Sequence, residues 1–389
     1  MTEGFHPSTH PPLPPTTEDD RVSWLRLLRS RRVGISTFYR MLNEHGSATA
    51  ALAALPDVAG QAGINNYAPC PEGVAIAELR DGRRAGARMI CVGDADYPRD
   101  LLDLNDAPPI LWVRGDLSLL SRPRISLVGA RNASSLGGRM ARALARELAQ
   151  HGFVTVSGLA RGIDTAVHHA TVDTGTIAVM AGGVDVVYPA ENAQLADDIA
   201  KKGLMVSEQP IGTQPQARHF PRRNRLISGL GKAVILIEAA AKSGSLITAR
   251  NALDQGREVL AVPGHPFDAR ASGCNMLIRD GATLVRNAED VIEALGPIAT
   301  PATQVEMGLT PPEIPAPPPQ KRTWRDAAQL HRLILDRLGP SPMAEDQLIR
   351  DLGAPANSVA PVLVDMELDG KIQRQAGGLL SRHTDSKSN

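Results

Sequence analysis

Three short segments of the chain combine glycine and other small residues with a cation, each at or just before the start of an expected helix. They are Gly129-Ala130-Arg131-Asn132, Ser157-Gly158-Leu159-Ala160-Arg161-Gly162 and Lys242-Ser243-Gly244-Ser245. Glycine lets backbone N–H groups face outward, and the start of a helix adds partial positive charge, so each segment has the chemistry of a phosphate site. Three such segments on one edge of a sheet predict a polyanion that runs across them, rather than one small ligand.

The most concentrated positive charge lies between Arg218 and Arg225, where four arginines and one aromatic residue occur within eight positions. Guanidinium groups bind phosphate oxygens in pairs, and an aromatic ring can stack on a nucleobase. We therefore expect nucleic-acid contacts from Phe220, Arg222, Arg223, Asn224 and Arg225. For Phe220 two interpretations stay open, a stacking surface for a base or a part of the hydrophobic core.

The phosphate segments do not follow the patterns of common nucleotide cofactor sites. The run 129–134 departs from G-x-G-x-x-G, no acidic residue at the end of the second strand could hold a ribose, and the P-loop signature is absent. Asp164 is expected to be structural, in the first turn of a helix. Asp185 and His265 have no metal-ligand partners at a recognisable spacing. The sequence predicts no cofactor, no metal site and no catalytic residue.

The elements that position these residues follow from an alternation that starts at about residue 87. Strands are expected at 125–128, 154–156, 177–180, 204–206, 234–237 and 259–262, and helices at 138–150, 162–171, 194–201 and 245–255. Continuous apolar strands between helices indicate a parallel sheet covered on both faces. Ligands of such sheets bind at the carboxyl ends of the strands, where the three phosphate segments lie.

The predicted fold class is α/β, with a Rossmann-like parallel sheet core over 87–296 and a smaller domain on each side. Residues 1–20 form a Pro- and Thr-rich tail that we expect to be disordered, and 21–86 form a helical domain similar to SAM or helix-hairpin-helix units. A proline-rich linker at 297–322 precedes a winged-helix-like domain at 323–383. Its expected third helix, 356–369, is acidic and has no Lys or Arg, so we expect this domain to contact protein rather than DNA.

Composition limits the classes of function only weakly. Lys+Arg and Asp+Glu both number 42, so any affinity for nucleic acid must come from the local placement of charge. The three cysteines are far apart and form no metal-type spacing, which is typical of a reducing compartment. No secretory signal and no apolar run of about 18 residues occurs, so we expect a cytoplasmic protein without a membrane segment.

Several runs of the sequence resemble the DprA/Smf family, also called DNA-processing protein A. They are SGLARGIDTAVHHA, GTIAVMAGGVDVVYPAEN, FPRRNRLISGL, EAAAKSGSLITARNALDQGREVLAVPG and SGCNMLIRDGATLV. The resemblance covers residues 87–296 densely, and the order of the flanking domains fits. It implies a domain that binds and protects single-stranded DNA, forms a homodimer and helps load the RecA recombinase in natural transformation. It also implies that Arg131, the 157–162 loop, Arg222–Arg225 and Lys242–Ser245 face DNA, and it assigns no catalytic residue.

The competing interpretation is an enzyme. Nucleotide phosphoribohydrolases of the Lonely Guy group have a related Rossmann-like fold and carry a P-G-G-x-G-T-x-x-E element. The corresponding loop here is AKSGSLITA, with no glutamate after Thr248. Glu208 and Glu238 are carboxylates that could be mistaken for catalytic groups. We therefore expect a DNA-binding protein that is not an enzyme.

Overall fold

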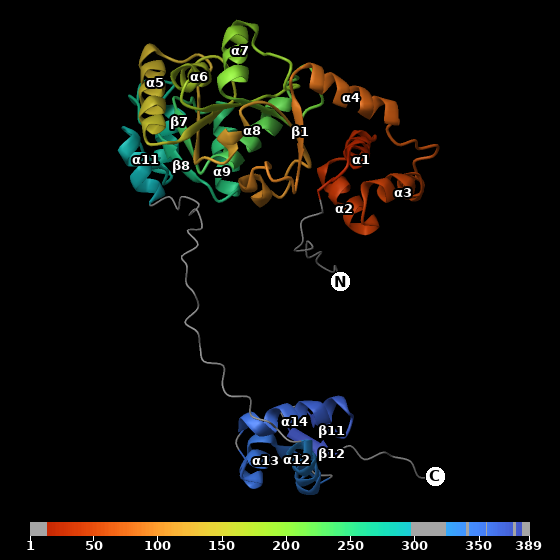
Figure 1. Cartoon of the computed structure of the whole chain (residues 1–389). Helices are drawn as coiled ribbons and strands as arrows, with labels where there is room; N and C mark the ends of the chain where they lie inside the picture. The colour runs from red at the N-terminus through yellow and green to blue at the C-terminus, as the bar shows by residue number, and fades with distance from the viewer. Residues whose placement is uncertain (1–13, 297–323, 340–341, 355, 376–378, 383–389) are drawn as a thin grey trace. The chain divides into compact units, whose positions relative to one another are not determined.

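The computed structural model describes residues 14–296, 324–339, 342–354, 356–375 and 379–382. The protein divides into two compact units, Met1–Pro301 and Ala302–Asn389, and each is described by itself (Figure 1). The predicted linker and residues 1–13 of the predicted tail lie outside the described residues.

The first unit begins with four helices: α1 (Glu18–Arg29), α2 (Ile35–His45), α3 (Ala48–Gln61) and α4 (Glu72–Arg84). Helix α1 starts within the predicted tail, because Thr17 and Asp20 form a capping box in which both side chains accept a hydrogen bond from the other residue's backbone N–H. The tail is therefore shorter than 1–20. Trp24 and Phe38 pack edge to face, with ring centroids 5.2 Å apart, in the core of this helical bundle.

The predicted Rossmann-like core is a nine-stranded sheet in the order β1-β2-β6-β5-β4-β3-β7-β8-β9. The strands are β1 (Arg88–Cys91), β2 (Ile110–Gly115), β3 (Arg124–Gly129), β4 (Val154–Ser157), β5 (Thr176–Val179), β6 (Leu204–Ser207), β7 (Ala233–Ile237), β8 (Glu258–Ala261) and β9 (Thr283–Leu284). The run from β6 to β9 is parallel, as predicted, whereas β1 and β2 add an antiparallel edge beside β6. All residues of β4 to β7 are buried, which explains their continuous apolar sequences.

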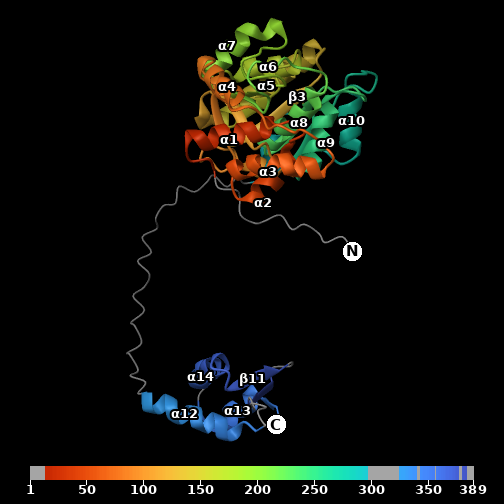
Figure 2. The same ribbon diagram turned by 90° about the vertical axis from the view of Figure 1, so that its right-hand side faces the viewer.

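Helices cover both faces of this sheet (Figures 1 and 2). The helices after α4 are α5 (Ser135–Gln150), α6 (Ile163–Thr171), α7 (Ala193–Lys202), α8 (His219–Leu230), α9 (Ser245–Asp254), α10 (Ser272–Arg279) and α11 (Ala288–Leu295). Short 3-10 turns occur at Arg99–Asp103, Leu117–Leu120 and Ala190–Asn192. Leu127 of β3 faces the α5 and α6 side, whereas Ser126 donates a hydrogen bond to the Ile227 carbonyl of α8 on the other side. The carboxyl ends of β3 and β7 thus lie at the edge of the sheet between the two layers of helices.

The helical bundle is joined to the edge of the sheet by polar contacts. Arg21 donates two hydrogen bonds of 3.0 Å to the Asp94 carboxylate, and the Tyr39 hydroxyl donates to the Ala107 carbonyl at 3.1 Å. These bonds connect segments about 70 residues apart in sequence. Together with the hydrophobic core that the bundle shares with the sheet, they hold the two in one compact unit.

The second unit has the winged-helix order that the sequence predicts. It contains α12 (Trp324–Arg337), β10 (Met343–Ala344), α13 (Glu345–Leu352), α14 (Ala356–Leu368), β11 (Ile372–Gln375) and β12 (Leu379–Arg382). Its three strands pair in the order β10-β12-β11 around a core that includes Ile334, Leu348 and Leu363. The wing cation Arg374 is paired with Glu345 and Glu367, and Lys371 is paired with Asp369. Much of the wing's positive charge is therefore neutralised within the domain.

Candidate nucleic-acid interface

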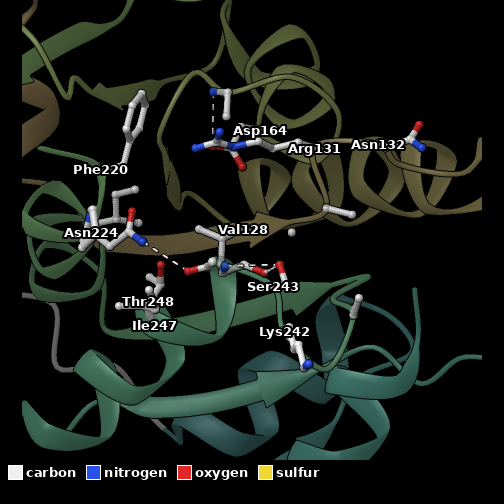
Figure 3. A pocket seen from close by; sticks show the side chains of 18 of the residues that line it. Val128, Arg131, Asn132, Asp164, Phe220, Asn224, Lys242, Ser243, Ile247 and Thr248 are labelled. Atoms are coloured by element: carbon white, nitrogen blue, oxygen red, sulfur yellow. Dashed lines mark hydrogen bonds between the residues drawn. The ribbon is translucent and has the colours of Figure 1, made fainter. Parts of the chain in front are cut away.

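A cavity of about 610 Å³ lies at the carboxyl ends of β3 and β7. Strand β3 has β4 on one side and β7 on the other, so this is the point where the parallel sheet reverses its order of strands. The cavity brings together nine of the predicted residues: Gly129, Arg131, Phe220, Arg223, Asn224, Lys242, Ser243, Gly244 and Ser245. Figure 3 shows that the labelled side chains come from several separate loops and helices.

Arg223 differs from the other cations of this cavity because it is only 5% exposed. Its buried Nε atom has no hydrogen-bond partner among the described residues. Burial lowers the pKa of its guanidinium to about 10, although the nearby Asp164 carboxylate opposes this shift. A buried cation without a hydrogen-bonded partner is costly, and an anion in the cavity could offset this cost by pairing with the guanidinium.

The guanidinium of Arg223 lies on the backbone of Gly158, where any side chain would overlap it. Asp164 lies beneath this loop and accepts hydrogen bonds from the N–H groups of Gly158 at 3.1 Å and Ala160 at 3.3 Å. Burial raises the pKa of the Asp164 carboxyl, while Arg223 and these two N–H groups act in the opposite direction. Asp164 is thus a structural residue, as the sequence indicates.

Phe220 lies at the cavity surface and is absent from the buried hydrophobic clusters of the described residues. The guanidinium carbon of Arg131 lies 4.9 Å from the centroid of its ring, and that of Arg223 lies 6.0 Å away. The Tyr188 ring lies 5.8 Å away at an angle of 58°. Of the two interpretations of Phe220, the structure thus supports the surface position, where an aromatic ring could meet a base.

A second, smaller cavity of about 220 Å³ adjoins the first and shares Arg131, Phe220 and Arg223 with it. The predicted residues Gly158 and Arg161 line it. Arg161 is exposed and donates a 3.1 Å hydrogen bond from Nε to Glu191. Because that ion pair is exposed to solvent, it holds Arg161 only weakly.

The 157–162 loop does not present its amides in the way that the sequence suggests. The N–H groups of Gly158 and Ala160 donate to Asp164, and the N–H of Leu159 donates to Nε2 of His168 at 3.3 Å. A glycine is required at position 162 because a side chain there would overlap the Ala130 carbonyl, and not because a phosphate must approach the backbone. These three amides are therefore not available to a phosphate, and the cations beside the loop are the arginine side chains Arg161 and Arg223.

Three other predicted residues lie away from the main cavity. Ser157 is fully buried and donates its hydroxyl hydrogen to the Leu127 carbonyl at 2.7 Å. Arg225 forms ion pairs with Asp106 and Glu208, and burial raises the pKa of that glutamate. The exposed Arg222 lines a separate hollow with Arg225, beside the start of α2. Neighbouring arginines of one helix thus have three different environments.

Several residues that sequence reasoning missed also line the two cavities. Thr248 and Arg270 line the larger one, and the half-exposed Tyr188 lines the smaller one, whereas Asn132 of the first predicted segment lines both. Arg270 follows strand β8, so a search of every segment after a parallel strand could have found it.

The described residues contain neither a metal-binding cluster nor a membrane-spanning helix. Among the described residues, no group of three or more His, Cys, Asp or Glu side chains is arranged to hold a metal ion. No helix in the described part of the protein is long and apolar enough to cross a bilayer.

Comparisons with known proteins point to one family. Residues 88–296 match the family "DNA recombination-mediator protein A", residues 18–80 match the DprA-like N-terminal HHH domain, and residues 306–378 match the DprA winged helix domain. The DNA processing protein DprA of Bacillus subtilis is 47% identical over 216 residues, which are 73% of that protein and 55% of this one.

Two solved structures are also similar. DprA from Streptococcus pneumoniae superposes with a TM-score of 0.57 at 35% identity, over 98% of that protein and 67% of this one. DprA from Helicobacter pylori, whose structure concerns its single-stranded DNA binding mode, gives a TM-score of 0.50 at 30% identity, over 95% of that protein and 54% of this one.

Proposed function

The chain belongs to the DprA/Smf family of DNA-processing proteins, and from that premise we propose that it binds single-stranded DNA across the two adjoining cavities. We further propose that it protects this DNA and helps load the RecA recombinase, as a cytoplasmic homodimer. The resemblance of the matched segments and the description of the family as a recombination mediator support the RecA role.

The observation that carries the DNA proposal is the state of Arg223. Its guanidinium is buried, its Nε is without a partner among the described residues, and it faces both cavities. The cations Arg131, Lys242 and Arg270 surround the larger cavity and are exposed. A phosphate in the cavity could pair with the guanidinium of Arg223, and the surrounding cations would hold the phosphates on either side.

The preference for a single strand follows from Phe220. A duplex hides the faces of its bases in the stack, whereas a single strand can place a base against an aromatic ring at the protein surface. Phosphate contacts carry no base code, so binding should tolerate any sequence. Single-strand affinity should also fall with salt, with a log–log slope of roughly −0.7 per phosphate neutralised.

A binding role without catalysis is supported by the carboxylates beside the cavities. Asp164 accepts two backbone N–H groups, Glu238 accepts from Ser134, and Glu208 is paired with Arg225. A general base needs a free oxygen within reach of substrate, and these groups already hold the protein's own donors. A nucleotide hydrolysis assay on the purified protein is expected to show no turnover.

The test of this function is fluorescence anisotropy with a labelled oligothymidine and a labelled duplex of equal length. The single strand is expected to bind at least about tenfold more tightly, since one base contact alone is worth roughly 1–3 kcal/mol. Equal affinity for both forms would contradict the proposal. RecA loading is tested separately, by the rate at which RecA displaces a single-strand-binding protein with and without this protein.

A further inference from the structure

The amino-terminal end of α5 is occupied by a carboxylate of the protein itself. This end follows β3, at the point where the order of parallel strands reverses. In Rossmann-type folds, the pyrophosphate of a nucleotide binds at such a helix start. Here the Ser134 N–H donates to Oε2 of Glu238 at 2.8 Å, and the Ser134 hydroxyl donates to Oε1.

The surrounding residues fit this carboxylate closely. Gly137 lies in the first turn of α5, and a side chain there would overlap the carboxyl group of Glu238. Glu238 has a φ of 61°, in the left-handed region that glutamate rarely adopts. The side chain is thus held at the helix start by two hydrogen bonds and by a backbone conformation that is unfavourable for its residue type.

We propose that Glu238 determines specificity, by excluding small phosphorylated nucleotides from a site that the fold would otherwise offer them. Its carboxylate takes the N–H and hydroxyl donors at the start of α5 and places a negative charge there. Anion binding is then left to the side chains of Arg131, Arg223 and Lys242 in the adjoining cavity.

Charge explains which ligands are affected most. A terminal phosphate carries about two negative charges near neutral pH, whereas each phosphodiester of DNA carries one. Coulomb repulsion by a fixed carboxylate grows with the charge of the group beside it, so a terminal phosphate is repelled more strongly at this position than a single phosphodiester of DNA. This inference rests on the proposed function in one respect only, namely that the ligand the protein still binds is single-stranded DNA.

The main test variant is Glu238→Gly. Glycine is favoured at this positive φ, so the change removes the carboxylate and also relieves the backbone. The matched control is Glu238→Gln, which removes the charge but still fills the space at the start of α5. Binding of inorganic phosphate and of ADP is measured by titration calorimetry, and binding of a labelled oligothymidine by anisotropy.

E238G is expected to bind phosphate and ADP roughly tenfold more tightly than the unmodified protein, because the variant loses a fixed negative charge and frees the donors at the positive end of the helix dipole. E238Q is expected to gain much less, and both variants should bind oligothymidine at least as well as the unmodified protein. If E238G is insoluble, Glu238→Asn serves instead, because asparagine tolerates the left-handed region.

Two results would overturn the inference. One is a folded E238G that binds phosphate and ADP no better than the unmodified protein. The other is an unmodified protein that already binds ADP as tightly as E238G. If no form binds oligothymidine, the proposed function fails, but the comparison of phosphate affinities still decides the role of Glu238.

Discussion

Arg223 and Arg222 offer a sharp test of the interface, because they are adjacent in α8 and carry the same charge. Arg223 is 5% exposed, whereas Arg222 is exposed and lines a different hollow. If DNA were held only by the long-range electrostatic field of the protein, replacing either arginine with alanine would weaken DNA binding equally. If a phosphate occupies the position beside Arg223, the two variants must differ strongly.

The expected magnitude follows from the state of Arg223. Burial lowers its pKa from 12.5 to about 10, so part of the cost of removing this charge from water is already present in the folded protein without DNA. DNA binding adds little to that cost, so the bond to phosphate should contribute about 2–3 kcal/mol, at the upper end for charge-assisted hydrogen bonds. Arg223→Ala should therefore weaken oligothymidine binding about thirtyfold to hundredfold, and Arg222→Ala only about twofold to fivefold.

The assay is anisotropy with labelled oligothymidine over a salt series. A buried contact is screened less than an exposed one, so the R223A defect should persist at high salt while the R222A defect disappears. Arg223→Lys should also stay impaired, because a lysine ammonium lacks the planar fork of arginine. Thermal melting checks that each variant is folded. Equal defects in R222A and R223A, both vanishing with salt, would refute the reasoning.

Three further predictions concern other parts of the molecule. Gly158→Ala should displace the Arg223 guanidinium that lies on this glycine and reproduce the binding defect of R223A by anisotropy; normal binding would show that this contact is dispensable. His168 is fully buried and its pKa is lowered by burial to about 3, so below pH 6.5 the unfolded state takes up a proton that the folded state refuses. Stability should fall by about 2 kcal/mol between pH 7.5 and pH 5 on this account, and His168→Gln should show a smaller fall in urea unfolding. Deleting residues 297–389 should leave oligothymidine affinity within about threefold, because the paired wing cations contribute little; a loss of about a hundredfold would show that this domain binds DNA.

The parallel core could be predicted from the sequence because its strands are buried on both faces. The apolar runs at β3 to β8 are continuous and separated by helical patterns, so the parallel sheet and the edge that carries the loops could be predicted, whereas the order of strands within the sheet was not. The antiparallel strands β1 and β2 were missed. They stand outside the strand–helix alternation on which the prediction rested, with only a 3-10 turn between them.

The environment of each arginine could not be predicted in the same way. Arg222, Arg223 and Arg225 are identical in type, and only the folded protein brings Glu208 and Asp106 to Arg225 and leaves Nε of Arg223 without a partner among the described residues. Those acidic residues come from distant parts of the sequence. The density of positive charge therefore indicates a candidate interface, but it does not show how each arginine is buried or paired.

The direction of the loop amides is a second feature that local sequence does not determine. Glycine-rich spacing indicates a turn, but the partners of its N–H groups depend on side chains of the next helix. Asp164 and His168 turn the amides of the 157–162 loop inward. The glycine-rich loop, whose sequence is typical of a phosphate-binding loop, instead packs through Gly158 against the guanidinium of Arg223.

The most direct test of the central claim is a crystal structure of this protein bound to a short oligothymidine. We expect a phosphodiester oxygen within hydrogen-bond distance of the Arg223 guanidinium, with an adjoining base against Phe220. A strand bound elsewhere, with Arg223 still lacking an acceptor, would contradict it.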